Sequence, residues 1–208
     1  IAKIMPDHKL CVAPMMGCTD RHCRYLFRLL SPNAMLYSEM VVTGALVFGD
    51  APAFLQHADD EPCSFQLGGS DPEQLAAAAK LIEQAGYQEV NLNCGCPSDR
   101  VQVGGIGACL MADPELVTQC YTAMSDAVSI PVTIKSRIGI DEHNDYAFLA
   151  RFISPLYAAG CRTFIVHARN AILKGLSPKE NREIPTLKYE YVYRAMEESP
   201  EANFVLNG

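Results

Sequence analysis

The chain has 208 residues, 49% of them hydrophobic, which is enough to bury the core of one large domain. Its formal charge of −7 at pH 7 argues against a general polyanion binder, so any contact with nucleic acid must be local. Nine cysteines, an odd number without framework-like spacing, favour a reducing cytoplasm. No apolar run approaches the roughly 18 residues needed to cross a bilayer.

Short apolar segments of strand type alternate with longer helical patterns along the whole chain. Strands are predicted at 10–15, 34–40, 63–67, 89–94, 132–138, 163–168 and 204–206. Helices are predicted at 20–30, 72–85, 114–128, 145–159, with a kink or break near Pro155, and 187–198. In the first helix, Arg21, Arg24 and Arg28 follow helical spacing and are expected on its solvent face. This alternation indicates parallel strands joined by crossover helices.

Polar residues at the ends of successive strands distinguish a closed (β/α)8 barrel from an open doubly wound sheet. They are Gln66, Asn93, Lys135, Arg137, His167, Arg169 and Asn207. A barrel mouth collects functional groups from many strand ends, whereas an open sheet concentrates them at one switch point. The sequence therefore predicts a barrel. Because only seven strands are counted and a complete barrel has about 250 residues, residues 1–208 are expected to form an incomplete one.

The run from Val90 to Pro97 carries the clearest chemical signal. Asn91 and Asn93 share one face of a buried strand, where amides require hydrogen-bond partners. The strand then breaks, which leaves Cys96 on a loop beside those amides. Cys94 is interpreted as packing, because no second Cys/His pair completes a metal site. A thiol in this position is suited to chemistry on a ligand that needs hydrogen bonds.

Several motifs occur in a fixed order over essentially the whole chain. They are Ala13-Pro14-Met15, Phe65-Gln66-Leu67-Gly68-Gly69, Asn91-Leu92-Asn93-Cys94-Gly95-Cys96-Pro97, Lys135-Ser136-Arg137-Ile138-Gly139, His167-Ala168-Arg169, and residues 19–25 and 174–185. In this order they resemble the tRNA-dihydrouridine synthases, and the last two stretches are similar to the bacterial A subfamily.

The resemblance implies an FMN-dependent barrel that reduces the C5–C6 bond of uridine in the tRNA D loop, at positions 20 and 20a. NADPH would reduce the flavin, the flavin would deliver hydride to C6, and Cys96 would donate the proton to C5. A thiol suits that role because it is mostly protonated near neutral pH yet can release its proton. Family members also carry a C-terminal helical domain that binds tRNA, and this chain is expected to lack it.

The resemblance also implies a set of binding residues. Lys135 would lie near the N1/O2 edge of the flavin, His167 on its ribityl-phosphate side, and Gln66 at a pyrimidine-like edge of flavin or uracil. Each has a structural alternative: a surface lysine, a structural histidine and a core amide. Ala13, Pro14 and Met15 would cover the flavin through their backbone, and Asn207 and Gly208 complete the cofactor set. The substrate set is Asn93, Arg137, Arg169, Lys179 and Arg182, with Asn93 also open to a core-amide role.

Two other functions compete with tRNA reduction. A flavin barrel could act on a free pyrimidine, as dihydroorotate dehydrogenases do. The loop at 168–182 argues against this, because a local basic patch suits an RNA backbone. The loop contains one acidic residue, Glu180, and four basic residues, Arg169, Lys174, Lys179 and Arg182. The same loop could be no more than a solvated charged segment. The chain could instead be a non-catalytic fragment, which a missing flavin absorbance band would reveal.

Overall fold

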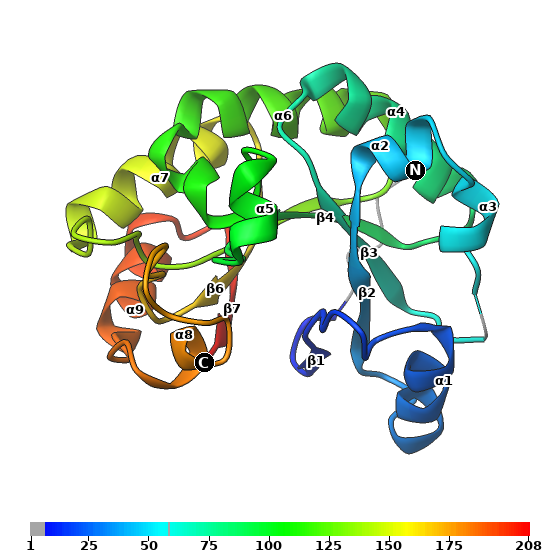
Figure 1. Ribbon diagram of the computed structural model, residues 1–208, viewed down its shortest axis with the longest axis horizontal. Helices are drawn as coiled ribbons and strands as arrows, with labels where there is room; N and C mark the ends of the chain where they lie inside the picture. The colour runs from blue at the N-terminus through cyan, green and yellow to red at the C-terminus, as the bar shows by residue number, and fades with distance from the viewer. Residues whose placement is uncertain (1–6, 58) are drawn as a thin grey trace. The chain divides into compact units, whose positions relative to one another are not determined.

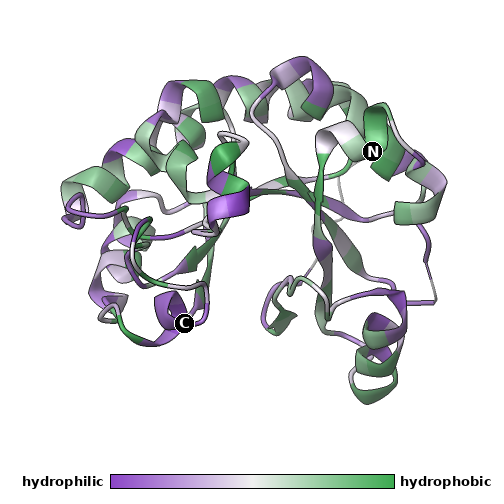
Figure 2. Cartoon of the chain, viewed as in Figure 1, coloured by the Kyte–Doolittle hydropathy of each residue, from purple (hydrophilic) through white to green (hydrophobic). Residues whose placement is uncertain are grey.

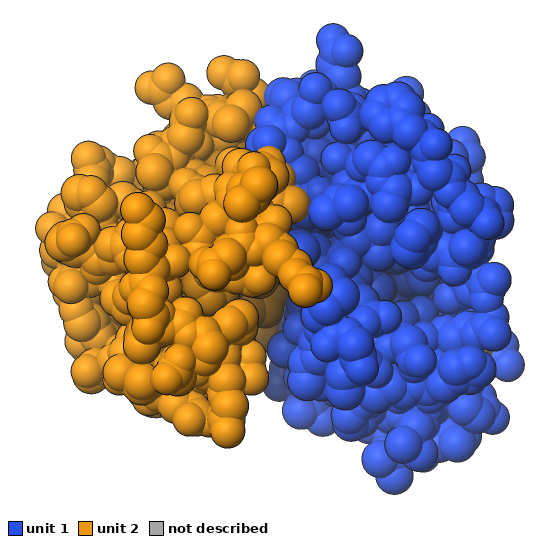
Figure 3. Space-filling view, in the orientation of Figure 1, with its two compact units in different colours: residues 1–92, 123–132 blue, residues 93–122, 133–208 orange. Residues whose placement is uncertain are grey.

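The computed structural model describes residues 7–57 and 59–208. The chain divides into two compact units (Figure 3). Unit 1 contains residues 1–92 and 123–132, and unit 2 contains residues 93–122 and 133–208.

Unit 1 is built on parallel strands that follow one another in chain order (Figure 1). Strand β1 (Cys11–Val12) pairs with β2 (Met35–Val42), β2 with β3 (Cys63–Gly68), and β3 with the first part of β4 (Glu89–Cys94). Its helices are α1 (Arg21–Leu30), α2 (Thr43–Val47), α3 (Ala51–Phe54) and α4 (Pro72–Gln84). Helix α6 (Pro114–Ala127) begins in unit 2 and ends in unit 1.

Unit 2 repeats the same pattern. Strands β5 (Val132–Ser136), β6 (Thr163–His167) and β7 (Asn203–Asn207) are parallel neighbours in chain order. The connections contain α5 (Asp99–Val103), the 3₁₀ helix η1 (Gly107–Ala112), α7 (Tyr146–Ala158), α8 (Glu180–Glu183) and α9 (Tyr189–Glu198). The helices carry both hydrophobic and hydrophilic stretches, as expected when one face packs and the other meets solvent (Figure 2).

A strand is observed at each predicted strand segment, and the bounds predicted for β4 are those observed. The strand predicted at 10–15 is limited to Cys11–Val12, and the one predicted at 132–138 ends at Ser136. Every residue of β3 and β4 is buried. The polar face of β4 is satisfied, because Gln66 Nε2 donates to Asn91 Oδ1 at 2.7 Å and Glu89 Oε2 lies 2.7 Å from His8 Nε2. Helix α7 runs without a break and contains Pro155. Among the described residues, no helix combines the length and hydropathy that spanning a bilayer requires.

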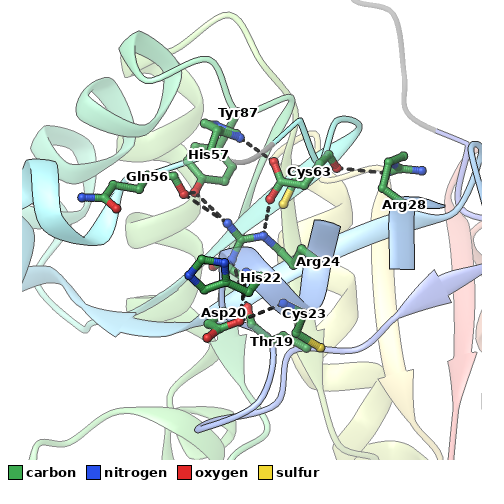
Figure 4. Close-up of polar contacts among 12 residues, drawn as sticks. Thr19, Asp20, His22, Cys23, Arg24, Arg28, Gln56, His57, Cys63 and Tyr87 are labelled. Carbon is green, nitrogen blue, oxygen red and sulfur yellow. Dashed lines mark hydrogen bonds and ion pairs between the residues drawn. The ribbon is translucent and has the colours of Figure 1, made fainter. Parts of the chain in front are cut away.

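The prediction that Arg24 lies on the solvent face of α1 is wrong. Arg24 is 4% exposed; its Nε donates to Asp60 Oδ2 and its Nη1 donates to Thr19 O at 2.9 Å (Figure 4). His57 Nδ1 lies 2.8 Å from the other oxygen of Asp60. Burial acts to raise the pKa of Asp60, but the hydrogen bonds from His57 and Arg24 outweigh it and lower the pKa to about 2. A guanidinium can therefore be buried here because a carboxylate and carbonyls satisfy it.

Candidate active site

Cys96 lies in unit 2 on the loop after β4, and its backbone is fixed by Asn93. The N–H groups of Gly95 and Cys96 both donate to Asn93 Oδ1, at 3.1 and 3.0 Å. This is the local turn that an asparagine side chain forms with the residues two and three positions on. Asn93 is 8% exposed, so the turn is buried on the strand side, whereas Cys96 is half-buried. The thiol is thus accessible while its backbone is constrained.

The first residues of η1 contact the backbone carbonyl of Cys96. The N–H of Ala108 donates to Cys96 O at 2.9 Å. Gly107 has φ +77°, and a Cβ there would lie 2.6 Å from Cys96 O. Only glycine combines that backbone angle with so close an approach. Both the N–H and the C=O of Cys96 are therefore engaged by its own loop and its neighbour.

Lys135, on β5, presents a half-buried amine in the same unit. Its Nζ donates to Asn207 Oδ1 at 3.3 Å. Burial lowers its pKa to about 8; the charge of Arg137 acts in the same direction and that of Cys96 in the opposite one. Lys135 thus carries a charge that burial disfavours and that a nearby negative group would stabilise.

His167 ends β6 and is 7% exposed. Its Nε2 is buried without a hydrogen-bond partner among the described residues. Burial, followed by the charges of Arg137 and Lys135, lowers its pKa to about 3, so the ring is neutral near pH 7. The backbone of Gly208 lies against this ring, since a Cβ at that glycine would be 2.7 Å from His167 Cδ2. A buried, neutral imidazole with an unused ring nitrogen is a candidate ligand-binding group.

Arg137 follows β5 and is 4% exposed. Its Nε donates to Gly95 O at 3.2 Å and its Nη1 to Asn181 O at 2.8 Å. Burial lowers its pKa to about 10, against the effect of Cys96. The guanidinium therefore binds the backbone of two loops. Its predicted contact with substrate stays a prediction.

The basic loop, residues 169–182, has buried residues near both ends and mostly exposed residues between them. Arg169 is half-buried, and its Nη1 donates to Glu183 O at 3.2 Å and to Pro185 O. Lys174, Lys179 and Arg182 are exposed. The exposed charges are available to a polyanion in solution.

The other predicted site residues belong to unit 1. Ala13 and Pro14 follow β1 and are half-buried, and Met15 is 40% exposed. Gln66 is 1% exposed and bonded to Asn91, as described above. Their convergence with the unit 2 residues around a flavin stays a prediction.

Two positioning residues were not predicted from the sequence. Asn181 is fully buried; its Oδ1 accepts from the N–H of Ile172 at 2.8 Å and its Nδ2 donates to Ile172 O at 2.9 Å. Gln102 Nε2 donates to Pro97 O and Leu173 O, at 2.8 and 2.9 Å. Gln102 lies on the short helix α5, outside the motifs that carry the resemblance. Asn181 lies within residues 174–185 on α8, where one asparagine among charged residues gives no signal of burial.

The donor set of unit 2 fits an anionic flavin. Among the described residues, neither Lys135 nor Arg137 forms an ion pair with a carboxylate within 4.0 Å, and burial lowers the pKa of both. His167 adds an unused buried nitrogen. An anion would compensate these cations and a flavin offers several acceptors for the donors. Within the described part of the chain, no cluster of three His, Cys, Asp or Glu residues could hold a metal.

Successive parallel strands with intervening helices, and polar side chains at or beyond their carboxyl ends, define the class of α/β domains to which (β/α)8 barrels belong. The dihydrouridine synthase (Dus) family model matches residues 11–208. The chain belongs to this family, which confirms the predicted family and the (β/α)8 fold class.

Relatives with high identity carry one name, tRNA-dihydrouridine(20/20a) synthase. The protein of Pseudomonas putida is 58% identical over 204 residues, which cover 98% of this chain and 61% of the relative. That of Shewanella oneidensis is 55% identical over 202 residues, 97% of this chain and 60% of the relative. That of Salmonella typhimurium is 54% identical over 205 residues, 98% of this chain and 62% of the relative. The chain spans about three fifths of the length of these relatives.

Proposed function

We propose that this protein reduces the C5–C6 bond of uridine in the D loop of tRNA to 5,6-dihydrouridine, with FMN as cofactor and NADPH as reductant. Family membership supports the reaction, and the name that the relatives carry supports positions 20 and 20a. The observation that carries the proposal is the half-buried Cys96 thiol on the loop after β4, whose backbone N–H and C=O are both held by hydrogen bonds.

Cys96 is the proposed proton donor. When bound, FMN supplies the hydride that C6 accepts, and NADPH provides the two electrons. The Sγ–H bond of Cys96 breaks as a C–H bond forms at C5, so that hydride and proton together add one hydrogen molecule across the double bond. The thiolate left on Cys96 regains its proton from solvent.

The residues of unit 2 proposed to bind the cofactor are Lys135, His167, Asn207 and Gly208. The remaining members of the predicted cofactor set are Gln66 and the backbone of residues 13–15. A fixed ammonium group beside a flavin stabilises the negative charge of its reduced form. A buried imidazole that is neutral near pH 7 can donate one hydrogen bond without adding charge.

The basic loop is the proposed contact with tRNA. Arg169, Lys179 and Arg182 would bind phosphates, while Asn93 and Arg137 lie at or beside the loop that carries Cys96. Phosphate contacts make affinity fall with salt concentration, whereas an enzyme for a free pyrimidine would show little such dependence. A tRNA substrate and nine free cysteines also fit a cytoplasmic location.

Incubation with FMN, NADPH and an unmodified tRNA transcript tests this proposal. We expect dihydrouridine in nuclease digests of the tRNA at positions 20 and 20a, measured by mass spectrometry. Free uridine and orotate, which both carry the C5–C6 double bond, replace the tRNA in parallel reactions. Turnover of either small molecule without modification of tRNA would favour the pyrimidine enzyme. A preparation that neither carries nor takes up flavin would support the non-catalytic alternative.

A further inference from the structure

The backbone carbonyls on either side of Cys96 are both bound by side chains. Gly95 O accepts from Arg137 Nε at 3.2 Å, and Pro97 O accepts from Gln102 Nε2 at 2.8 Å. All of these residues belong to unit 2. The loop that carries Cys96, residues 95–97, is hereafter the cysteine loop.

Each of the two side chains makes its second contact with the basic loop. Gln102 Nε2 also donates to Leu173 O at 2.9 Å, so both protons of one amide are used. Arg137 Nη1 donates to Asn181 O at 2.8 Å. Two separate bridges therefore connect the cysteine loop to the basic loop, one through the residue before Cys96 and one through the residue after it.

The backbone segments that the two bridges connect are themselves fixed by further hydrogen bonds. Leu173 N–H donates to Asp141 Oδ1 at 2.7 Å, next to the paired contacts between Asn181 and Ile172. On the cysteine loop, the N–H of Cys96 donates to Asn93 Oδ1. These hydrogen bonds therefore resist a displacement of either loop relative to the bridging side chains.

We propose that the cysteine loop and the basic loop move together. Gln102 is the positioning residue through which RNA binding to the basic loop changes the position of Cys96. The identity of the RNA rests on the proposed function, but the bridge itself does not. Contact between phosphates and the exposed Lys174, Lys179 and Arg182 would order the basic loop, and the bridges would order Cys96 with it.

Amide hydrogen exchange of the purified protein, with and without an unmodified tRNA transcript, tests the bridge directly. The reporters are the N–H groups of Cys96 and Leu173. In Gln102→Glu the two amide donors are replaced by a carboxylate that faces two carbonyls. We expect exchange at both reporters to rise about fivefold together, since each net hydrogen bond contributes about 1 kcal/mol. Gln102→Ala removes the donors without adding charge and covers the case in which Gln102→Glu does not fold.

Val103→Glu is the matched control, because it adds the same charge one residue away at a side chain that is 91% exposed. We expect this variant to exchange like the wild type. In kinetics, Gln102→Ala should lower the rate at which saturating tRNA reoxidises the reduced flavin, and leave flavin reduction by NADPH unchanged.

The decisive comparison is the protection that tRNA confers. In the wild type, tRNA should slow exchange at both reporters; in Gln102→Ala it should slow exchange at Leu173 more than at Cys96. Equal protection of Cys96 in both proteins, or an increase confined to one loop in the variants without RNA, would overturn the bridge. If tRNA protects neither reporter in the wild type, the proposed function fails instead, while the RNA-free comparison still decides whether the loops are coupled.

Discussion

Replacement of Lys135 by methionine should stabilise the flavin-free protein while weakening its affinity for FMN. The pKa of Lys135 falls from 10.5 to about 8 on folding. Because one pKa unit is worth about 1.4 kcal/mol, the charged amine is disfavoured by about 3 kcal/mol in the folded state. The variant also loses the hydrogen bond to Asn207 Oδ1, worth about 1.5 kcal/mol. The expected net gain is about 1–2 kcal/mol near neutral pH.

The stability gained by replacing Lys135 should depend on pH in a direction that follows from its pKa shift. The pKa of Lys135 is lower in the folded than in the unfolded state, so the penalty is complete below about pH 8. It fades between about pH 8 and pH 10.5, where the folded amine is already neutral, and is absent above that range. The gain from Lys135→Met should therefore be largest near pH 6.5 and shrink by about pH 9.5.

Urea denaturation of the flavin-free protein at these two pH values measures the gain. Lys80→Met, at an exposed lysine of α4, is the control and should change the free energy of unfolding by less than about 0.5 kcal/mol. FMN affinity is then measured by fluorescence quenching. A stability change of Lys135→Met that does not vary with pH, or an unchanged FMN affinity, would refute the reasoning.

Three further substitutions test other parts of the structure. Arg24→Met leaves Asp60 buried beside His57 alone and should destabilise the protein by about 3–5 kcal/mol in urea denaturation; an effect below 1 kcal/mol would contradict the buried pair. Gly107→Ala should displace Cys96 O and lower dihydrouridine formation, with FMN affinity as the unaffected control. Asn93→Ala removes the acceptor for two N–H groups and should accelerate amide exchange at Cys96; unchanged exchange would show that the turn is held by other contacts.

Acid should destabilise the protein through His167. Its pKa is about 3 in the folded protein and 6.5 ordinarily, so the unfolded chain binds more protons between these values. His167 therefore does not lower the free energy of unfolding above about pH 6.5, but lowers it progressively as the pH falls toward 3. His167→Gln should flatten this part of the pH profile of the urea midpoint.

The sequence predicts most of the fold because strand and helix patterns are local. In β4 the polar and apolar residues alternate, and the bounds read from that alternation are the observed ones. The short helices α2, α3, α5 and α8 were not predicted, since four or five residues are too few to show helical periodicity. The placement of Cys96 on a loop followed from Gly95 and Pro97, which end the strand.

The long-range contacts could not be predicted. Arg24 bonds to Asp60, 36 residues away, and nothing in the spacing of the arginines along α1 distinguishes a buried guanidinium from a solvated one. Gln102 reaches Leu173 across 71 residues. Such pairs depend on how the βα units pack, which a local pattern does not encode.

The pH dependence of Lys135 and the hydrogen exchange of the loops test parts of the site, whereas Cys96→Ala tests the proposed reaction itself. The measurement is a pair of rates on one protein preparation: reduction of bound flavin by NADPH, and formation of dihydrouridine in an unmodified tRNA transcript. The proposed role of Cys96 predicts a wild-type rate for the first and loss of the second. Dihydrouridine formation at the wild-type rate by Cys96→Ala would show that another group donates the proton to C5.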